Sequence, residues 1–178
     1  MTSNIPKSRT LGDLLDELAK SYRDNEAVIW KDSRLTYSQL KEEVDIFARS
    51  LLSLGIKRGE NVALIASNRP EWLIAMFAIA KIGATTVAIS TFSTQRELHW
   101  TLKHSRSSCV ISISSLKNHN FIENLQELCP EYKESKVGKL RSKALPRLKN
   151  IIAIEEKSIG AIINWHDLRK VAQMTKPE

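Results

Sequence analysis

The sequence predicts an α/β domain, built on a mainly parallel sheet with helices on both faces. The first observation is that residues 68–91 form an almost uncharged helical stretch that stops at Gly83 and runs into an apolar strand. The second is that short apolar stretches alternate with amphipathic ones along the rest of the chain. Strands that alternate with helices over connections of this length build parallel sheets covered by their crossover helices.

The N-terminal region predicts a helix followed by a hairpin. Leucines at helical spacing indicate a short amphipathic helix over about residues 10–22. Ala27–Trp30 and Arg34–Tyr37 then flank Lys31-Asp32-Ser33, in which Asp and Ser are typical turn residues. We therefore expect two short antiparallel strands ahead of the next helix.

The next helix has signals at both ends. Thr36 and Gln39 form a capping box, in which a hydroxyl and an amide satisfy free backbone N–H groups. Gly55 supplies the left-handed conformation that ends the helix. The segment that follows, Asn61–Ala66, is short and almost wholly apolar, which indicates a strand buried on both faces.

The central helix is predicted by a second capping pattern. Asn68 and Glu71 repeat the capping box, and Pro70 falls in the first turn, where a missing N–H costs nothing. No position from Leu73 to Ala80 is polar, so we expect this helix to be covered on most sides. Thr85–Ser90 is then expected as a second buried strand.

The second half of the chain continues the alternation of helices and strands. Thr94 and Glu97 cap a helix over about residues 94–105. The remaining expected elements are the strand Cys109–Ile113, the helix Leu116–Leu128, the strand Asn150–Glu155 and the short helix Trp165–Ala172.

The positive charge of the chain is concentrated in one segment. Of a net charge of +7, residues 133–149 carry +6, from seven Lys and Arg against Glu134 alone. Little apolar periodicity, with Gly138 and Pro146, predicts a flexible, solvated loop over about 131–148. Such a loop would attract an anion: a nucleotide, coenzyme A or acidic lipid head groups, with at most peripheral membrane contact. No nucleic acid is expected, because no aromatic residues alternate with the basic ones to stack on bases.

Composition indicates an ordinary soluble protein, with 42% hydrophobic and 26% charged residues. The longest apolar run, Trp72–Ala80, is about half as long as a bilayer-spanning helix requires. The first ten residues lack the apolar core of a secretory signal. Cys109 and Cys129 form no C-x-x-C pair and are expected to be reduced structural thiols. We expect one cytoplasmic domain over residues 1–178.

Four segments carry motifs in a fixed order. They are Leu35-Thr36-Tyr37-Ser38-Gln39-Leu40, Gly55–Ala63, Asn68-Arg69-Pro70-Glu71-Trp72, and Lys81-Ile82-Gly83-Ala84 followed by Val87–Thr91. They resemble L-T-Y-x-E-L, G-(V/I)-x-x-G-D-x-V-A, N-x-P-E-W and K-A-G-A-x-x-V-P-L-N-T of the adenylate-forming enzymes, the acyl-CoA synthetases and their relatives. Gln39 replaces the acid of the first motif, and Ala88 and Ser90 replace Pro and Asn of the last.

The resemblance covers about residues 10–172 and implies the N-terminal subdomain of an AMP-dependent synthetase, most similar to fatty acyl-CoA synthetases. In that family a carboxylic acid attacks the α-phosphate of ATP, and coenzyme A then takes the acyl group from the adenylate. The family therefore implies ATP, Mg and coenzyme A as ligands. Its Ser/Thr/Gly-rich loop with a lysine, Thr-Glu pair, ribose-binding Asp and C-terminal lysine have no counterpart in these 178 residues.

The position of the predicted strands suggests where a ligand would lie. Ligands of open parallel sheets bind beyond the carboxyl ends of the strands, which makes Ser67, Asn68, Ser90 and Thr91 pocket-edge candidates. Each also has a plainer interpretation, Asn68 as a helix cap and the others as turn residues. We expect no catalytic, cofactor-binding or metal residue, since no His or Cys has metal-ligand spacing.

Three functions follow from these patterns. The first is an N-terminal fragment of an acyl-CoA synthetase, inactive alone, whose partner would be the missing catalytic remainder. The second is a stand-alone, non-catalytic binding or interaction module of the same fold. The third, an unrelated small nucleotide binder, is disfavoured because the six glycines form no phosphate cradle. Trp72 and Trp100 are expected in the core or at a subdomain contact.

Overall fold

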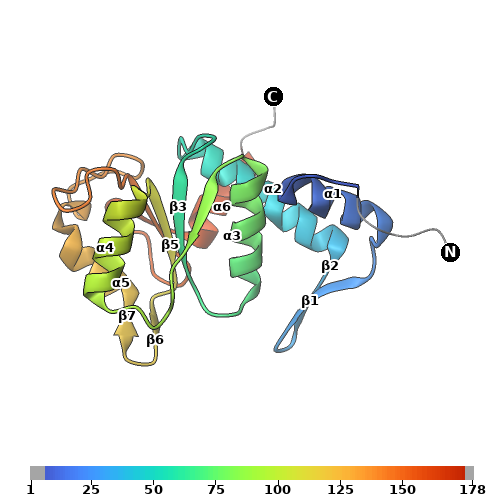
Figure 1. The fold of residues 1–178 in the computed structure, drawn as a ribbon, viewed down its shortest axis with the longest axis horizontal. Helices are drawn as coiled ribbons and strands as arrows, with labels where there is room; N and C mark the ends of the chain where they lie inside the picture. Colours follow the sequence, from blue (N-terminus) through green and yellow to red (C-terminus); the bar gives the residue numbers. More distant parts are fainter. Residues whose placement is uncertain (1–6, 175–178) are drawn as a thin grey trace.

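The sheet is built from the segments that the sequence marks as apolar. The computed structural model describes residues 7–174 and contains a sheet in the order β4-β3-β5-β8-β9 (Figure 1). All of its strand pairings are parallel. The strands are β3 (Asn61–Ile65), β4 (Thr85–Ala88), β5 (Cys109–Ser112), β8 (Asn150–Ala153) and β9 (Ile162–Asn164). The predicted parallel sheet is confirmed, with β9 as a strand that the sequence analysis did not predict.

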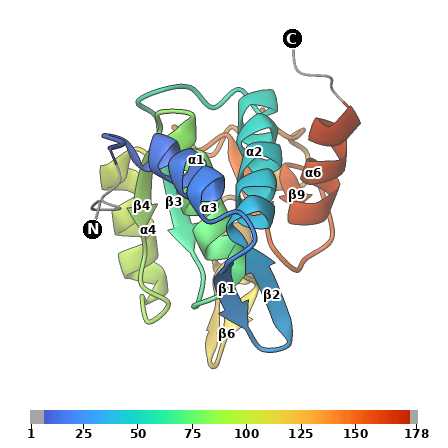
Figure 2. The ribbon, with the colours of Figure 1, turned by 90° about the vertical axis from the view of Figure 1, so that its right-hand side faces the viewer.

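Helices cover both faces of the sheet, as predicted (Figure 1). One face carries α2 (Tyr37–Ser53), α3 (Pro70–Lys81) and α6 (Trp165–Met174), and the other carries α4 (Gln95–Ser105) and α5 (Phe121–Leu128). The first helix, α1 (Leu11–Ser21), packs across α2 and α3 (Figure 2). Both capping boxes that start α2 and α4 are present as predicted.

Two hairpins project from the end of the molecule where the strands of the sheet finish (Figure 1). One is the predicted pair β1 (Glu26–Trp30) and β2 (Ser33–Thr36), which is antiparallel. The other is β6 (Ser115–Leu116) with β7 (His119–Asn120). The predicted helix Leu116–Leu128 is therefore wrong in its first part, because Lys117 turns the chain with a φ of 53°. The helix begins at Phe121, where the apolar periodicity becomes regular.

The prediction that Thr85–Ser90 is buried on both faces is also wrong. The strand ends at Ala88, and both Thr85 and Ala88 are exposed. The physical reason is its place in the sheet, since β4 pairs only with β3 and is the edge strand. By contrast, every residue of β5 and β8 is buried, as is typical of interior strands.

The basic segment has little regular structure but is not simply solvated. A 3-10 helix, η1 (Pro130–Tyr132), precedes a long irregular path to β8. Leu140, Leu145 and Leu148 along this path are buried in the core. The leucines anchor the backbone, while the lysines and arginines of the same segment are exposed. The predicted solvation is therefore confirmed for the charged side chains only, and the flexibility of the segment stays a prediction.

Predictions about the two ends of the chain fall partly outside the described structure. The expectations of no secretory signal and of a domain over 1–178 include residues 1–6 and 175–178, which lie outside the described range. Among the helices within that range, none has the length and apolarity needed to cross a membrane.

Candidate functional site

The four predicted pocket-edge residues lie at the carboxyl edge of the sheet. Ser67 and Asn68 follow β3, and Ser90 and Thr91 follow β4. Because β3 and β4 are neighbours in the sheet, both pairs lie at the same edge, as predicted. Ser67 and Thr91 are half-buried, whereas Asn68 and Ser90 are exposed. Ligand binding by any of them stays a prediction.

These residues could line a ligand pocket or could serve as helix-cap and turn residues. Local hydrogen bonds distinguish the two interpretations for some of them. The Ser90 hydroxyl accepts a bond from the Phe92 N–H at 3.1 Å, which is a turn contact. Asn68 does not cap α3, because the cap residue is Arg69 and makes no side-chain capping bond. The predicted capping box is therefore wrong. Pro70 opens the helix one residue later than that box requires, and the Glu71 carboxylate is bonded to the Arg69 guanidinium instead.

Arg69 connects the segments that follow three neighbouring strands. Its Nε donates to Glu71 Oε2 at 2.8 Å, and its Nη2 donates to Glu71 Oε1 at 3.2 Å. Its Nη1 donates to Glu155, the second residue after β8. Glu155 in turn accepts from the Ser114 N–H, just beyond β5, at 2.8 Å. This network was not predicted from the sequence; the available signal was an arginine four residues after a strand and two before a glutamate.

The charge of Arg69 is neutralised within this network. The hydrogen bonds that Arg69 donates to Glu71 raise the pKa of Arg69; burial opposes the rise, and the bond to Glu155 adds to it. Burial pushes the pKa of Glu71 upward, but the bond from Arg69 outweighs it and holds that pKa below its usual value. With only 14% of its side chain exposed and two carboxylates bonded to it, Arg69 is a structural clamp and not a free anion-binding cation.

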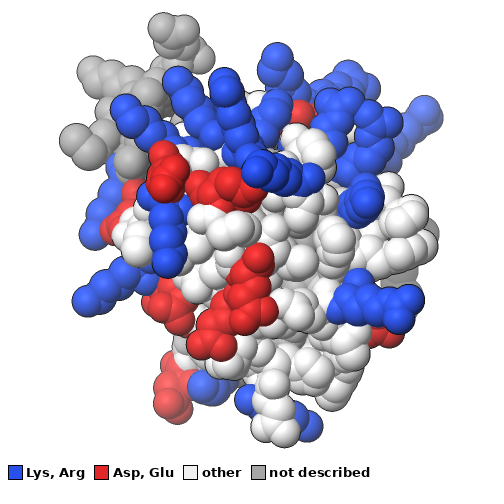
Figure 3. Space-filling view, turned by 90° about the vertical axis from the view of Figure 1, so that its left-hand side faces the viewer, with Lys and Arg blue, Asp and Glu red and all other residues white. Residues whose placement is uncertain are grey.

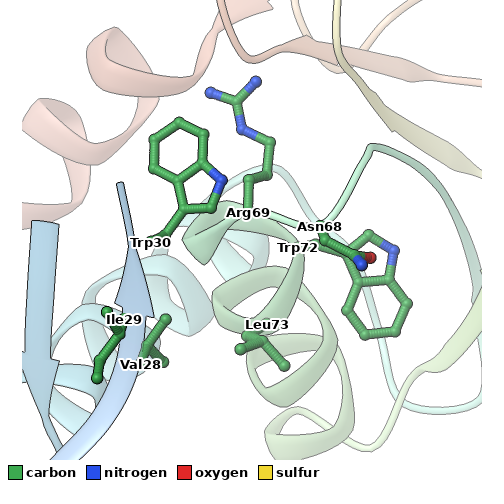
Figure 4. Close-up of a pocket in the computed structure, with 7 residues that line it drawn as sticks. All are labelled: Val28, Ile29, Trp30, Asn68, Arg69, Trp72 and Leu73. Atoms are coloured by element: carbon green, nitrogen blue, oxygen red, sulfur yellow. The ribbon is translucent and has the colours of Figure 1, made fainter. Parts of the chain in front are cut away.

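A cavity of about 280 Å³ opens beside the clamp (Figure 4). Hairpin residues line one side of the cavity, and the start of α3 lines the other: Val28, Ile29, Trp30, Asn68, Arg69, Trp72 and Leu73. The Arg69 guanidinium lies 5.8 Å from the centre of the Trp30 ring, within cation–π range. The lining is mostly apolar and contains no nucleophile or general base. The cavity can hold an apolar group, but its lining has no side chain that could catalyse a reaction.

The carboxyl edge does not fit magnesium or a triphosphate. Magnesium prefers carboxylate oxygens, but the nearby carboxylates of Glu71 and Glu155 are bonded to Arg69. Within residues 7–174 no group of three or more His, Cys, Asp or Glu is placed to hold a metal. A triphosphate requires free cations and a cradle of backbone N–H groups, which the clamp does not provide. No catalytic step is assigned to these residues.

The cysteines and tryptophans that the sequence singles out lie in different environments. Cys109 and Cys129 are buried free thiols, as predicted, and burial raises the pKa of both, so neither is a ready nucleophile. Trp72 is half-buried and packs against the core. Trp100 is 60% exposed and stacks on His104 with ring centres 4.1 Å apart, so it is not a core residue.

Comparison with known proteins identifies relatives over nearly the whole chain. The family profile described as "AMP-binding enzyme" matches residues 15–173. The chain is 36% identical over 166 residues to "Putative acyl-CoA synthetase YngI" of Bacillus subtilis (strain 168), covering 92% of this chain and 30% of YngI. It is 30% identical over 158 residues to the human mitochondrial medium-chain acyl-CoA ligase ACSF2, covering 88% of this chain and 26% of ACSF2. The chain thus spans less than a third of either relative.

Solved structures give the same fold. The anthranilate CoA ligase AuaEII, in complex with anthranoyl-AMP, matches with a TM-score of 0.74 at 22% identity, over 96% of this chain and 29% of that one. The N-terminal domain of FACL13 from Mycobacterium tuberculosis matches with a TM-score of 0.71 at 20% identity, over 96% of this chain and 38% of that one. The fold is that of the N-terminal subdomain of adenylate-forming ligases, and the chain belongs to the AMP-binding enzyme family.

Proposed function

We propose that this chain is the N-terminal framework of an AMP-forming acyl-CoA synthetase. The whole enzyme would convert a fatty acid, ATP and coenzyme A into acyl-CoA, AMP and pyrophosphate. Membership of the AMP-binding family and similarity to acyl-CoA ligases support this assignment. ATP, magnesium and coenzyme A are then ligands of the whole enzyme, and a cytoplasmic location is part of the proposal.

The observation that carries the framework role is the Arg69 clamp. It joins the segments after β3, β5 and β8 at the edge where parallel sheets place their ligands. In the clamp, Arg69 is paired with Glu71 and Glu155, so none of the three is free for adenylation chemistry. We infer that the described residues give this edge its shape and that the chain does not form an adenylate by itself.

A chimera tests the framework role. The matched N-terminal segment of human ACSF2 is replaced by residues 15–173 of this chain, and octanoyl-CoA formation is measured. The chimera should form octanoyl-CoA, because a framework can be exchanged between members of one fold. ACSF2 without its matched segment is the control and should be inactive. A chimera that is monodisperse and folded by circular dichroism, yet inactive, would contradict the proposal.

A stand-alone binding module is the second candidate, favoured by large apolar side chains on the surface. Phe92, Trp100 and Ile29 are 69%, 60% and 58% exposed. Exposed apolar surface of this kind marks interaction sites when it is contiguous. The module predicts a stoichiometric complex when the tagged chain is purified from its own cells. A monodisperse monomer without a partner would count against it.

A further inference from the structure

A second cavity lies at the amino edge of the sheet, opposite the clamp. It has a volume of about 220 Å³. Its walls come from the segments that lead into three strands: Glu60 and Asn61 at β3, Arg106 and Ser108 before β5, and Arg147 and Lys149 before β8. Because those strands are parallel and adjacent, their leading segments converge at one edge. The cavity is therefore a fixed feature of the sheet.

Three cations line this cavity without carboxylate partners. Among the described residues, Arg106, Arg147 and Lys149 form no ion pair. The one acid in the lining is Glu60, and its Oε2 already accepts a hydrogen bond from the Lys57 N–H at 2.9 Å. The cavity thus has an excess of positive charge. Arg69 at the opposite edge differs, since two carboxylates neutralise it.

Ser108, one of the lining residues, carries a buried hydroxyl that makes no hydrogen bond among the described residues. Its residue is only 7% exposed, and its Oγ has no partner within the described part of the chain. Its backbone is fixed on both sides: the N–H donates to Asn61 O at 2.9 Å, and the carbonyl accepts from the Lys149 N–H at 2.8 Å. A buried hydroxyl without a partner costs stability, so its presence among free cations points to a ligand.

The small cavity adjoins a larger basic groove. This groove has a volume of about 550 Å³ and is lined by Lys139, Arg141 and Lys143, among others. Lys149 lines both the groove and the small cavity. Figure 3 views the molecule from the left-hand side of Figure 1 and shows that Lys and Arg gather along its top. This is the end at which the 131–148 loop lies in Figure 1. Positive charge therefore continues from the cavity along the surface.

We propose that the amino edge of the sheet binds a phosphate group of an anionic ligand. Arg106, Arg147 and Lys149 balance its charge, and the Ser108 hydroxyl donates to one of its oxygens. The small cavity falls below the roughly 300 Å³ at which pockets for drug-sized ligands begin, so it takes a phosphate group and not a whole nucleotide. The groove takes further negative charge of the same ligand. The site is independent of the proposed ligase function, because it lies at the opposite edge.

Calorimetric titration of the 178-residue chain with sodium tripolyphosphate tests the site. The titration is run at about 0.15 M ionic strength, which screens loose surface attraction. Lys149→Ala and Arg147→Ala should each weaken binding by about tenfold, the size expected for one charge-assisted bond. Lys20→Ala is the matched control, since it removes one exposed lysine from α1, outside both basic cavities. The control should bind like the wild type.

Ser108→Ala tests whether the anion is bound by a specific hydrogen bond or only attracted by the positive charge of the surface. The variant should fold normally, because the hydroxyl that it removes has no partner, and its thermal midpoint should be no lower than that of the wild type. Its affinity for tripolyphosphate should fall by at least about tenfold, as for a lost hydrogen bond to a charged group.

A second arm replaces tripolyphosphate with vesicles of equimolar phosphatidate and phosphatidylcholine, which shows whether the phosphate belongs to a lipid. Binding in either arm that depends on Ser108 and Lys149 supports the site. The proposal is overturned if neither probe binds, if Ser108→Ala binds like the wild type in both arms, or if Lys20→Ala loses as much affinity as Lys149→Ala.

Discussion

The rings of Phe47 and Trp165 stack with their centres 3.7 Å apart and an angle of 24° between their planes. Phe47 belongs to α2 and Trp165 begins α6, and both side chains are fully buried. The pair joins the last described helix to an early one. The segment after the basic loop is therefore part of the same core as the first half of the chain.

Replacing this aromatic pair should be costly. Trp165→Ala is expected to lower the free energy of unfolding by about 3–5 kcal/mol, from lost burial and the cavity left behind. Trp100→Ala is the matched control, because Trp100 is 60% exposed. It should change stability by less than about 1 kcal/mol. Urea unfolding measures both, and equal losses would show that the stacked pair does not organise the core.

Two glycine positions separate backbone strain from steric conflict. Gly55 and Gly160 both have positive φ, 79° and 59°. A Cβ at Gly55 meets nothing within 4 Å, whereas one at Gly160 would lie 2.0 Å from the carbonyl oxygen of Tyr132. Gly55→Ala should cost about 1–2 kcal/mol from the left-handed backbone alone. Gly160→Ala should cost distinctly more in chemical unfolding, and a loss no larger than that of Gly55→Ala would contradict the close approach to η1.

Removal of the clamp should leave a half-buried carboxylate without its cation. Arg69→Ala is expected to lower the free energy of unfolding at pH 7 by about 1–3 kcal/mol, because Glu71 loses both of its guanidinium bonds. The deficit should shrink below about pH 4, where the glutamate becomes protonated. Arg34→Ala removes an exposed pair with Glu26 and should cost less than about 1 kcal/mol. A pH-independent deficit would argue against the clamp.

An ion-pair cluster between α1, α2 and α3 sets a further pH dependence. Burial pushes the pKa of Asp45 upward, but hydrogen bonds from Lys41 and Lys81 outweigh it and lower that pKa. Burial pushes the pKa of Lys81 downward, but bonds to Asp16 and Asp45 outweigh it and raise that pKa.

These pKa shifts determine how the free energy of unfolding falls on the acid side and on the alkaline side of its pH profile. The contribution of Asp45 is complete above its unfolded pKa of about 3.9 and is lost as pH falls through its lower folded value. The contribution of Lys81 is complete below about 10.4 and is lost as pH rises through its higher folded value. Guanidinium unfolding across pH should therefore give a plateau between these limits. Asp45→Asn should weaken the acid limb, and an unchanged limb would contradict its ionised state.

The features of the fold that were predicted correctly depend on residues close together in the sequence. The capping boxes at Thr36 and Thr94 and the left-handed Gly55 depend on neighbouring residues only, and all three are present. The apolar strands were found because burial on both faces leaves an uninterrupted apolar run. The edge position of β4 was not predictable in this way, since it depends on which strand lies outside it.

Long-range contacts account for what the sequence could not predict about the site. Arg69 and Glu155 are 86 positions apart, and no local pattern relates them. The same holds for the amino-edge cavity, where Arg106 and Lys149 meet only because β5 pairs with β8. The basic stretch was visible as charge, but its three buried leucines follow no helical or strand period. The edge that holds the ligand candidates was predictable, because strand direction follows from element order.

The most direct test of the framework role is ATP–pyrophosphate exchange by the purified 178-residue chain. The assay uses saturated fatty acids of several chain lengths with ATP and magnesium, and full-length human ACSF2 as the positive control. We expect exchange at background with every acid, because the only cation among the residues that line the carboxyl-edge cavity is bound to Glu71 and Glu155. Exchange clearly above background from this chain alone would contradict the framework role.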